Sequence, residues 1–213
     1  MTQAVSTILI LSVILNFLAL GSPNLKSCIR AVAIQGILLS IFPLALAGAP
    51  TPRLLLLVLV SVTVKGLLIP WTLFRALREV HIKHEAEPYL GQLPAVLLCA
   101  IGTGLALLFT DQLPLATEHR DLLIVPVALS TLLTGFLLLT TRRKAITQVI
   151  GYLTLENGIF VFAQLLHEAM PFLVEVGALL DLIVGIFVMG IVMNHIQREY
   201  SSLDTERLSE LRD

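Results

Sequence analysis

Charged residues are scarce in this chain, and their scarcity excludes most soluble folds. Asp, Glu, Lys and Arg make up 14% of its 213 residues, whereas soluble domains carry about 25%. Hydrophobic residues make up 56%, and the mean hydropathy is +0.91. This composition indicates an integral membrane protein with little mass outside the lipid bilayer.

Motifs for cofactor and nucleic-acid binding are also missing. The two cysteines, Cys28 and Cys99, lie far apart and form no CxxC pair, so the chain alone offers too few thiolates for an iron–sulfur cluster or a structural zinc site. No P-loop, Rossmann fingerprint, nucleophile elbow or metal-spaced His/Cys set occurs. The longest basic block is RRK at 142–144, which does not favour nucleic-acid binding. We therefore expect no cofactor, no metal and no independent catalytic activity.

Long apolar runs are what the chain has in abundance. Each run approaches or exceeds the roughly 17–25 residues that cross about 30 Å of hydrocarbon, and Pro and Gly mark the breaks between runs. The expected fold is an all-α integral membrane protein with about seven transmembrane helices. The runs cover residues 4–21, 29–48, 52–75, 93–110, 122–141, 145–167 and 171–195.

Lys and Arg are divided unevenly between the segments that join these runs. With the N-terminus outside, the cytoplasmic segments hold eleven of them and the outer loops hold two, Arg53 and Arg120. Because cytoplasmic loops carry the excess of positive charge, we predict an N-out, C-in topology. The first run has no basic n-region and no A-x-A-like site, so we expect a retained helix rather than a cleaved signal.

The order of the runs indicates four parts. Residues 1–90 form an N-terminal three-helix unit, 91–121 a connecting transmembrane helix and outer loop, 122–196 a second three-helix unit, and 197–213 a cytoplasmic tail. Both three-helix units have a basic turn before their second helix and an ionisable residue in their third. This leaves open a parallel 3+3 repeat with one extra helix. The link TTRRKA is so short that the helices on either side should form an antiparallel hairpin.

Three ionisable side chains lie near the middle of apolar runs: Lys65, Glu156 and Asp181. Each is roughly ten residues from either end of its run, which is some 15 Å from water at about 1.5 Å per residue. A charge at that depth costs about 2.5–3.5 kcal/mol on insertion scales, so such residues face inward and usually mark an ion or proton path. We expect these three to meet inside the bundle as a proton or charge relay.

The run that contains Glu156 carries a polar stripe. Gln148, Tyr152 and Glu156 recur at i, i+4 and i+8, and Asn157 follows directly. Burial in a low-dielectric medium favours the neutral form of a carboxyl group, so Glu156 could hold a proton near neutral pH and release it when a cation approaches. Gln148, Tyr152 and Asn157 are secondary candidates for the same path. The alternative is structural, with a protonated Glu156 donating a hydrogen bond between helices.

Lys65 stands beside an expected helix break. Pro70 cannot donate to the carbonyl of Gly66, so the helix should bend next to the lysine. The Lys65 side chain can snorkel only part of the way to the interface, so it must be paired or lie in a wet cavity. The alternative is a static ion pair that only locks two helices. Glu175 lies about 9 Å nearer the outside than Asp181; it is a further secondary candidate, or a solvated side chain.

Two segments of the last runs resemble a known family. GYLTLENGIFVFA and VEVGALLDLIVGIFVMGIVM look like hydrogenase-4 component E, the small hydrophobic membrane subunit of formate-hydrogenlyase-type, group 4 nickel–iron hydrogenase complexes. The resemblance extends over the whole length and includes VTVKGLLIPWTL. Through its last three helices the family is similar to the NuoK subunit of respiratory complex I and the C subunit of Mrp antiporters, so residues 122–196 resemble a NuoK-like unit.

The resemblance also carries expectations for individual residues. NuoK-type subunits have one glutamate on each of two adjacent helices, which form part of a proton path. Asp181 falls at the position of the second glutamate. Aligned on Gly151 and Asn157, this chain has Leu153 at the first position, and Glu156 follows nearly one turn later. The resemblance thus implies that Glu156 supplies an equivalent carboxylate on a similar face.

The function that the resemblance implies is a membrane-arm subunit of a redox-driven proton or sodium pump. Its partners would be antiporter-like (NuoL/M/N-type) subunits, other membrane-arm subunits and a peripheral redox module. The complex would lie in the inner or plasma membrane of a prokaryote. Two alternatives stay open. One is a small stand-alone ion transporter, and the other is a purely structural assembly subunit whose buried charges only specify helix pairing.

Overall fold

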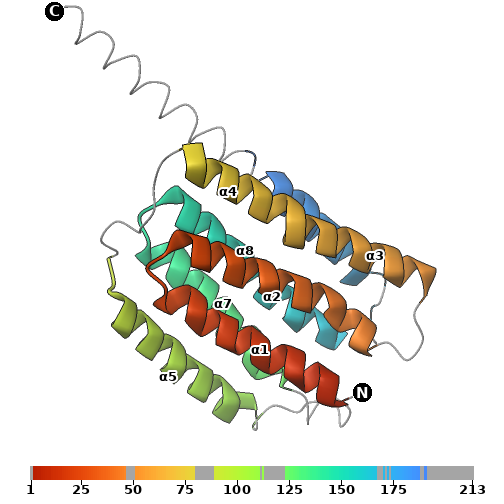
Figure 1. Cartoon of the computed structure of the whole chain (residues 1–213). Coiled ribbons are helices and arrows are strands. Elements are labelled where there is room, and N and C mark those ends of the chain that lie inside the picture. The colour runs from red at the N-terminus through yellow and green to blue at the C-terminus, as the bar shows by residue number, and fades with distance from the viewer. Residues whose placement is uncertain are drawn as a thin grey trace, which may run out of the picture.

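Long helices run side by side through the computed structural model of the chain (Figure 1). The structure describes residues 2–46, 51–79, 89–110, 112, 123–166, 170, 172, 174–187 and 190. The elements are α1 (Thr2–Gly21), α2 (Leu25–Leu46), α3 (Pro52–Thr63), η1 (Val64–Leu68), α4 (Ile69–Glu79), α5 (Gln92–Thr110), α7 (Ile124–Thr141), α8 (Ala145–Ala163) and η2 (Gln164–Leu166). Residues 174–187 are also helical.

The helices pack in layers that place α8 and α2 near the middle of the bundle. Helix α5 covers one side and packs on α1 and α7. Helices α1 and α7 pack in turn on α2 and α8. The continuous rod of α3, η1 and α4 lies on the opposite side against α2, and the blue helix of residues 174–187 lies beside it in Figure 1. The midplane residues therefore approach one another on the side of the bundle away from α5.

The all-α membrane fold predicted from composition is confirmed. Six helices of the described chain are long and apolar enough to cross a membrane, with the rod of α3, η1 and α4 counted as one. The seventh predicted run is helical over 174–187, and its end at 191–195 lies outside the described residues. The predicted tail, 197–213, lies outside them as well.

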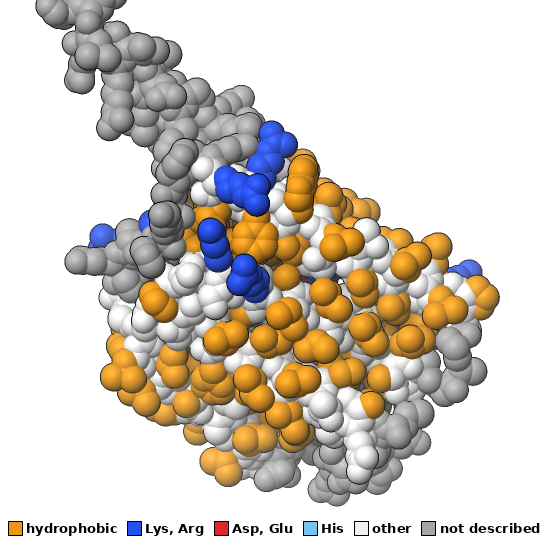
Figure 2. Space-filling view, in the orientation of Figure 1, with side chains coloured by type: hydrophobic (Ala, Val, Ile, Leu, Met, Phe, Trp, Pro, Cys, Tyr) orange, Lys and Arg blue, Asp and Glu red, His pale blue; other side chains and the backbone are white. Residues whose placement is uncertain are grey.

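The surface is that of a lipid-facing protein. Figure 2 shows one face covered largely by hydrophobic side chains, with Lys and Arg gathered at the end of the bundle where α4 lies. Helix α5 is the least buried span, and it exposes large side chains along its length, such as Leu97, Ile101, Leu105 and Leu108. This helix therefore offers most of its circumference to lipid or to another membrane subunit.

A π-helical turn, η1, interrupts the third span beside Lys65. It covers Val64–Leu68 and ends two residues before Pro70, whose ring nitrogen has no hydrogen to donate. The Ile69 N–H reaches back to the carbonyl of Val64, one residue further than in an α-helix. The turn widens the helix where the lysine leaves it, and π-turns of this kind occur frequently at functional sites.

Helices α7 and α8 form the hairpin that the short TTRRKA link predicts, and glycines let their backbones pack close together. A Cβ atom at Gly151 would lie 2.7 Å from the backbone nitrogen of Leu139 and 2.9 Å from the Cβ of Leu138. One at Gly158 would lie 2.8 Å from the backbone nitrogen of Leu132. Close approach of this type replaces the hydrophobic effect as a source of helix association in lipid. The hairpin of α7 and α8 thus forms a rigid support for Glu156 and Asn157.

Replacing Gly151 by Ala is expected to destabilise this hairpin by about 1–3 kcal/mol, because the added methyl group must displace backbone or packed side chains. Gly104→Ala is the matched control, since nothing lies within 4 Å of a Cβ at that position. The measurement is the thermal unfolding midpoint of the purified protein in detergent. Equal midpoints for the two variants would contradict the packing described here.

Candidate functional site

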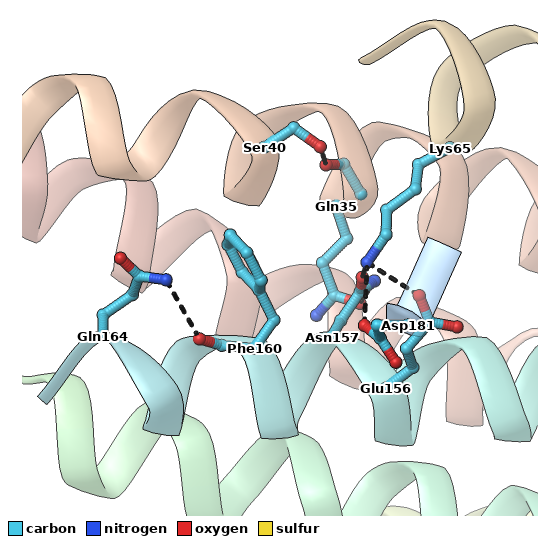
Figure 3. Close-up of polar contacts among 9 residues, drawn as sticks. Gln35, Ser40, Lys65, Glu156, Asn157, Phe160, Gln164 and Asp181 are labelled. Atoms are coloured by element: carbon cyan, nitrogen blue, oxygen red, sulfur yellow. Dashed lines mark hydrogen bonds and ion pairs between the residues drawn. The ribbon is translucent and has the colours of Figure 1, made fainter. Parts of the chain in front are cut away.

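Lys65, Glu156 and Asp181 meet at one point inside the bundle (Figure 3). The Lys65 ammonium nitrogen lies 2.9 Å from Glu156 Oε1 and 3.8 Å from Asp181 Oδ2. Lys65 comes from η1, Glu156 from α8 and Asp181 from the 174–187 helix. The structure therefore brings the three ionisable residues, which lie on three separate helices, into one ionic cluster.

The three side chains of the cluster are buried to different degrees. The exposed fractions of the side chains are 2% for Glu156, 10% for Lys65 and 23% for Asp181. Both carboxylate oxygens of Glu156 are buried and form no hydrogen bond within the described part of the chain, so its contact with Lys65 is an ion pair without hydrogen-bond geometry. Glu156 keeps acceptor capacity for a proton or a water molecule.

Two glycines make room for these side chains. A Cβ at Gly36 of α2 would lie 3.0 Å from the Cβ of Lys65, so the lysine stem passes directly over the bare backbone. A Cβ at Gly185 would lie 3.2 Å from Glu156 Oε2, which shows that the helix carrying Asp181 approaches the other carboxylate as well. Small residues at these contacts allow three helices to converge on one ammonium group.

Asn157 completes the coordination of the lysine. The Lys65 ammonium donates to Asn157 Oδ1 at 3.2 Å, and Asn157 Nδ2 donates to Gln35 Oε1 at 3.3 Å. The Lys65 nitrogen also lies 5.4 Å from the ring centroid of Phe160, within the range of a cation–π contact. The lysine is thus surrounded by two carboxylates, an amide oxygen and an aromatic face.

The remaining secondary candidates do not reach the lysine. Gln148 Nε2 donates to the carbonyl oxygen of Arg142 at the start of α8, at 3.3 Å. Tyr152 is half-buried and packs against the hydrophobic core. Glu175 is half-buried and lines a separate small cavity with Gln164. Among the described residues, the acidic partners of Lys65 are Glu156 and Asp181 alone.

Sequence reasoning missed the buried amides of α1 and α2. Gln35 and Asn16 are each 1% exposed, and Gln35 Nε2 donates to Asn16 Oδ1 at 2.8 Å. Each stands as an isolated amide within a long apolar run. That isolation was the available signal, because a polar group in a lipid-spanning helix needs a partner from another helix.

Two cavities adjoin the cluster. One of about 20 Å³ is lined by Lys65, Glu156, Asn157 and Pro70 together with apolar residues, and this volume suffices for one water molecule. A larger one of about 170 Å³ lies between α8 and the 174–187 helix and has Asp181 in its lining. The larger cavity and the greater exposed fraction of Asp181 both lie at the same end of the cluster.

The charge balance of the cluster determines its chemistry. One ammonium group faces two carboxylates, so the cluster carries a net charge of −1 when both acids are ionised and zero when one holds a proton. A net charge is costly in a low-dielectric interior. The two carboxylates and one ammonium thus form an ionic cluster whose opposite charges are unequal in number.

The chain has relatives among known bacterial proteins. It is 31% identical over 203 residues to the uncharacterized protein Rv0085 of Mycobacterium tuberculosis, covering 94% of this chain and 92% of that protein. It is 31% identical over 150 residues to hydrogenase-4 component E of Escherichia coli strain K12, covering 70% of this chain and 68% of that protein. The component E of Shigella flexneri gives the same values. No protein-family model matches the chain, and no solved structure matches it significantly.

Proposed function

Because this chain belongs to the hydrogenase-4 component E family, we propose that it is a membrane-arm subunit of a multi-subunit, redox-driven ion pump. In this role it contributes Lys65, Glu156 and Asp181 to a charge relay near the middle of the bilayer. The observation that carries the proposal is the convergence of two carboxylates from separate helices on one ammonium group, at 2.9 and 3.8 Å.

The relay would work through the charge balance of the cluster. Protonation of one carboxylate removes its attraction for Lys65, and the ammonium group then interacts more strongly with the other. A proton that enters at Asp181 therefore changes the state of Glu156, and the reverse holds. In this way a charge that changes in a neighbouring subunit can shift a proton here without any redox group in this chain.

The partners in this proposal are antiporter-like membrane subunits, other membrane-arm subunits and a peripheral redox module. Relatives named as a component of hydrogenase-4 support it. Exposed apolar side chains along α5 provide a surface for a neighbouring membrane subunit. We propose the inner membrane of a bacterium as the location, with the N-terminus outside and the C-terminus in the cytoplasm.

Affinity purification from native membranes separates this proposal from a stand-alone transporter. A tagged chain is expected to co-purify with several larger membrane proteins and a redox subunit, identified by mass spectrometry. Isolation of the chain alone, with ion transport activity after reconstitution, would instead favour the transporter.

Replacing Asp181 by Asn is expected to lower ion pumping by about 100-fold, the scale on which a positioned proton-transfer group contributes. The measurement is the number of ions moved per electron pair in inverted membrane vesicles, together with the redox rate of the complex, which should survive. Glu175→Gln is the matched control, because this acid lies on the same helix outside the cluster. Unchanged pumping in both Asp181→Asn and Glu156→Gln would exclude the relay.

A structural role is the second candidate function, favoured by the ion pairs that link three helices. In that case exchanging Lys65 and Glu156 should restore both assembly and pumping, since only the attraction between them matters. A relay predicts a different result for the exchanged pair. Assembly should return and pumping should not, because the carboxylate no longer lies beside Asp181 in its original position.

A further inference from the structure

A chain of hydrogen bonds leads from Lys65 away from the carboxylates and across the bundle. We name it the amide chain, after its members Asn157, Gln35, Asn16 and Thr131. All four are at most 2% exposed. Beyond Asn157 and Gln35, Asn16 Nδ2 donates to Thr131 Oγ1 at 2.9 Å, and Thr131 Oγ1 donates to the carbonyl of Val127 at 2.7 Å. The chain thus links η1, α8, α2, α1 and α7.

In every hydrogen bond of the amide chain, the donor lies on the side of Lys65 and the acceptor lies further from it. An ammonium group can only donate, so Asn157 must turn its oxygen to Lys65 and its nitrogen to Gln35. Gln35 must then accept with its oxygen and donate with its nitrogen, which reaches Asn16 Oδ1 at 2.8 Å and the Ser12 carbonyl at 3.1 Å. The positive charge on Lys65 therefore sets one direction for the whole chain.

From this direction we infer that Gln35, Asn16 and Thr131 are positioning residues that hold the Asn157 oxygen on Lys65, so that Lys65 acts as a fixed cation and the exchanged proton moves between Glu156 and Asp181. The inference rests on the proposed function, since it assigns roles within that relay. It divides the cluster into one group that keeps its charge and two groups that share a proton.

The reason lies in what surrounds the lysine nitrogen. The groups that contact it within the described part of the chain are two carboxylates, the Asn157 oxygen and the Phe160 ring face. A neutral amine could still donate to the Asn157 oxygen, but it would lose the charge that makes all four contacts strong. The amide chain keeps the Asn157 oxygen turned toward the nitrogen, and this arrangement favours the ammonium form of the lysine.

The proton transfer that remains is balanced within the two acids. The O–H bond of one carboxyl group breaks, and the proton forms an O–H bond with the carboxylate of the other, both of which lie against the Lys65 ammonium. The ammonium of Lys65 shifts toward the carboxylate that becomes negative, and the net charge stays zero. Primary amides neither bind nor release protons near neutral pH, so no proton leaves toward α1 and α7.

One Lys65 variant in the complete complex tests the fixed cation. Arg remains protonated under all conditions in a protein, so Lys65→Arg keeps a positive charge that cannot be exchanged. This variant is expected to keep coupled pumping at a rate lowered by about threefold to tenfold. A Lys65→Arg complex that assembles in wild-type amounts but does not pump would overturn the fixed cation.

A pair of variants tests the positioning role. Asn16→Leu keeps the branched shape and the number of side-chain heavy atoms and removes the acceptor of Gln35, and it is expected to lower the ions moved per electron pair by about tenfold. Ser12→Ala is the matched control. Its hydroxyl bonds only to its own helix, at Ile8, and its backbone carbonyl, which Gln35 uses, is kept. A purely structural amide chain would lower the amount of complex but leave the ions per electron pair unchanged, and that result would refute the positioning role.

The outcomes distinguish this inference from the function on which it rests. Normal pumping in both Glu156→Gln and Asp181→Asn would contradict the proposed relay itself. Loss of pumping in those two variants, combined with loss in Lys65→Arg, would support the relay but contradict the inference that Lys65 keeps its charge. Loss in the carboxylate variants, activity in Lys65→Arg and reduced coupling in Asn16→Leu together support both.

Discussion

Lys65→Met is expected to remove most of the folded subunit from the membrane, and a second change, Glu156→Gln, is expected to restore it. The single variant leaves Glu156, which is 2% exposed, without the cation that lies 2.9 Å from it. Breaking a buried ion pair by removing one partner costs about 3–5 kcal/mol, a large part of the total stability of a domain. The double variant replaces the stranded acid by an amide of the same shape.

The rescue is expected because removing one partner of a buried ion pair costs much more stability than removing both. Two partners removed together leave no uncompensated ion, and replacing a whole buried pair is often neutral. Asp181 is less deeply buried, with 23% of its side chain exposed, and lies further from the lysine nitrogen than Glu156 does. Glu156 is the more deeply buried and the closer of the two acids, which is why Glu156→Gln, rather than Asp181→Asn, should restore stability.

The measurement is the amount of subunit in purified membranes, together with its thermal unfolding midpoint in detergent. Lys26→Met is the matched control, because Lys26 is exposed near the start of α2 and should tolerate the change. Normal amounts and stability in Lys65→Met would show that the buried pair is not needed for folding. Failure of the double variant to recover would show that the lysine stabilises the fold through contacts other than Glu156.

Hydropathy and the cost of buried charge were sufficient to predict the spans and to select the three ionisable residues. The short TTRRKA link was sufficient for the hairpin of α7 and α8, which the close contacts at Gly151 and Gly158 now explain. These features depend on local composition and length. They need no knowledge of how one helix is rotated against another.

The polar stripe on α8 did not by itself predict which of its residues contact Lys65. Residues spaced by four turn by about 40° around a helix at each step, so Gln148 and Glu156 are separated by about 80°. Glu156 therefore faces Lys65, while Gln148 bonds to the start of its own helix at Arg142. A regular i, i+4 pattern identifies a side of a helix only approximately, and the contacts of its two ends can differ.

The amide chain could not be predicted either, because the sequence does not show how one helix is rotated against another. Gln35 and Asn16 are single polar residues in apolar runs, and a single residue does not define which face of a helix is buried. Their meeting depends on the register of α1 against α2, which the packing of many side chains determines. The π-turn adds to this, because it changes the direction in which Lys65 leaves its helix.

Glu156→Gln in an otherwise intact chain is expected to abolish ion pumping, by about 100-fold or more, while the subunit still assembles. The amide has the shape of the acid, and its oxygen can lie next to the Lys65 ammonium as the carboxylate oxygen does, so the cluster keeps its geometry without the exchangeable proton. Asp181 then remains the only acid beside the lysine. With one ammonium and one carboxylate, the cluster is neutral without a bound proton and no longer favours taking one up.

The experiment compares ions moved per electron pair in vesicles that contain wild-type or variant complex, with the redox rate measured in parallel. Thr154→Val is the matched control. Thr154 is fully buried on the same helix and donates only to its own turn, at Ile150, so pumping should persist. A complex that assembles with Glu156→Gln and pumps at the wild-type ratio would show that this carboxylate carries no proton. The buried ion pair would then serve the packing of the helices alone, because the only proton-binding difference between the two complexes is the group at this position.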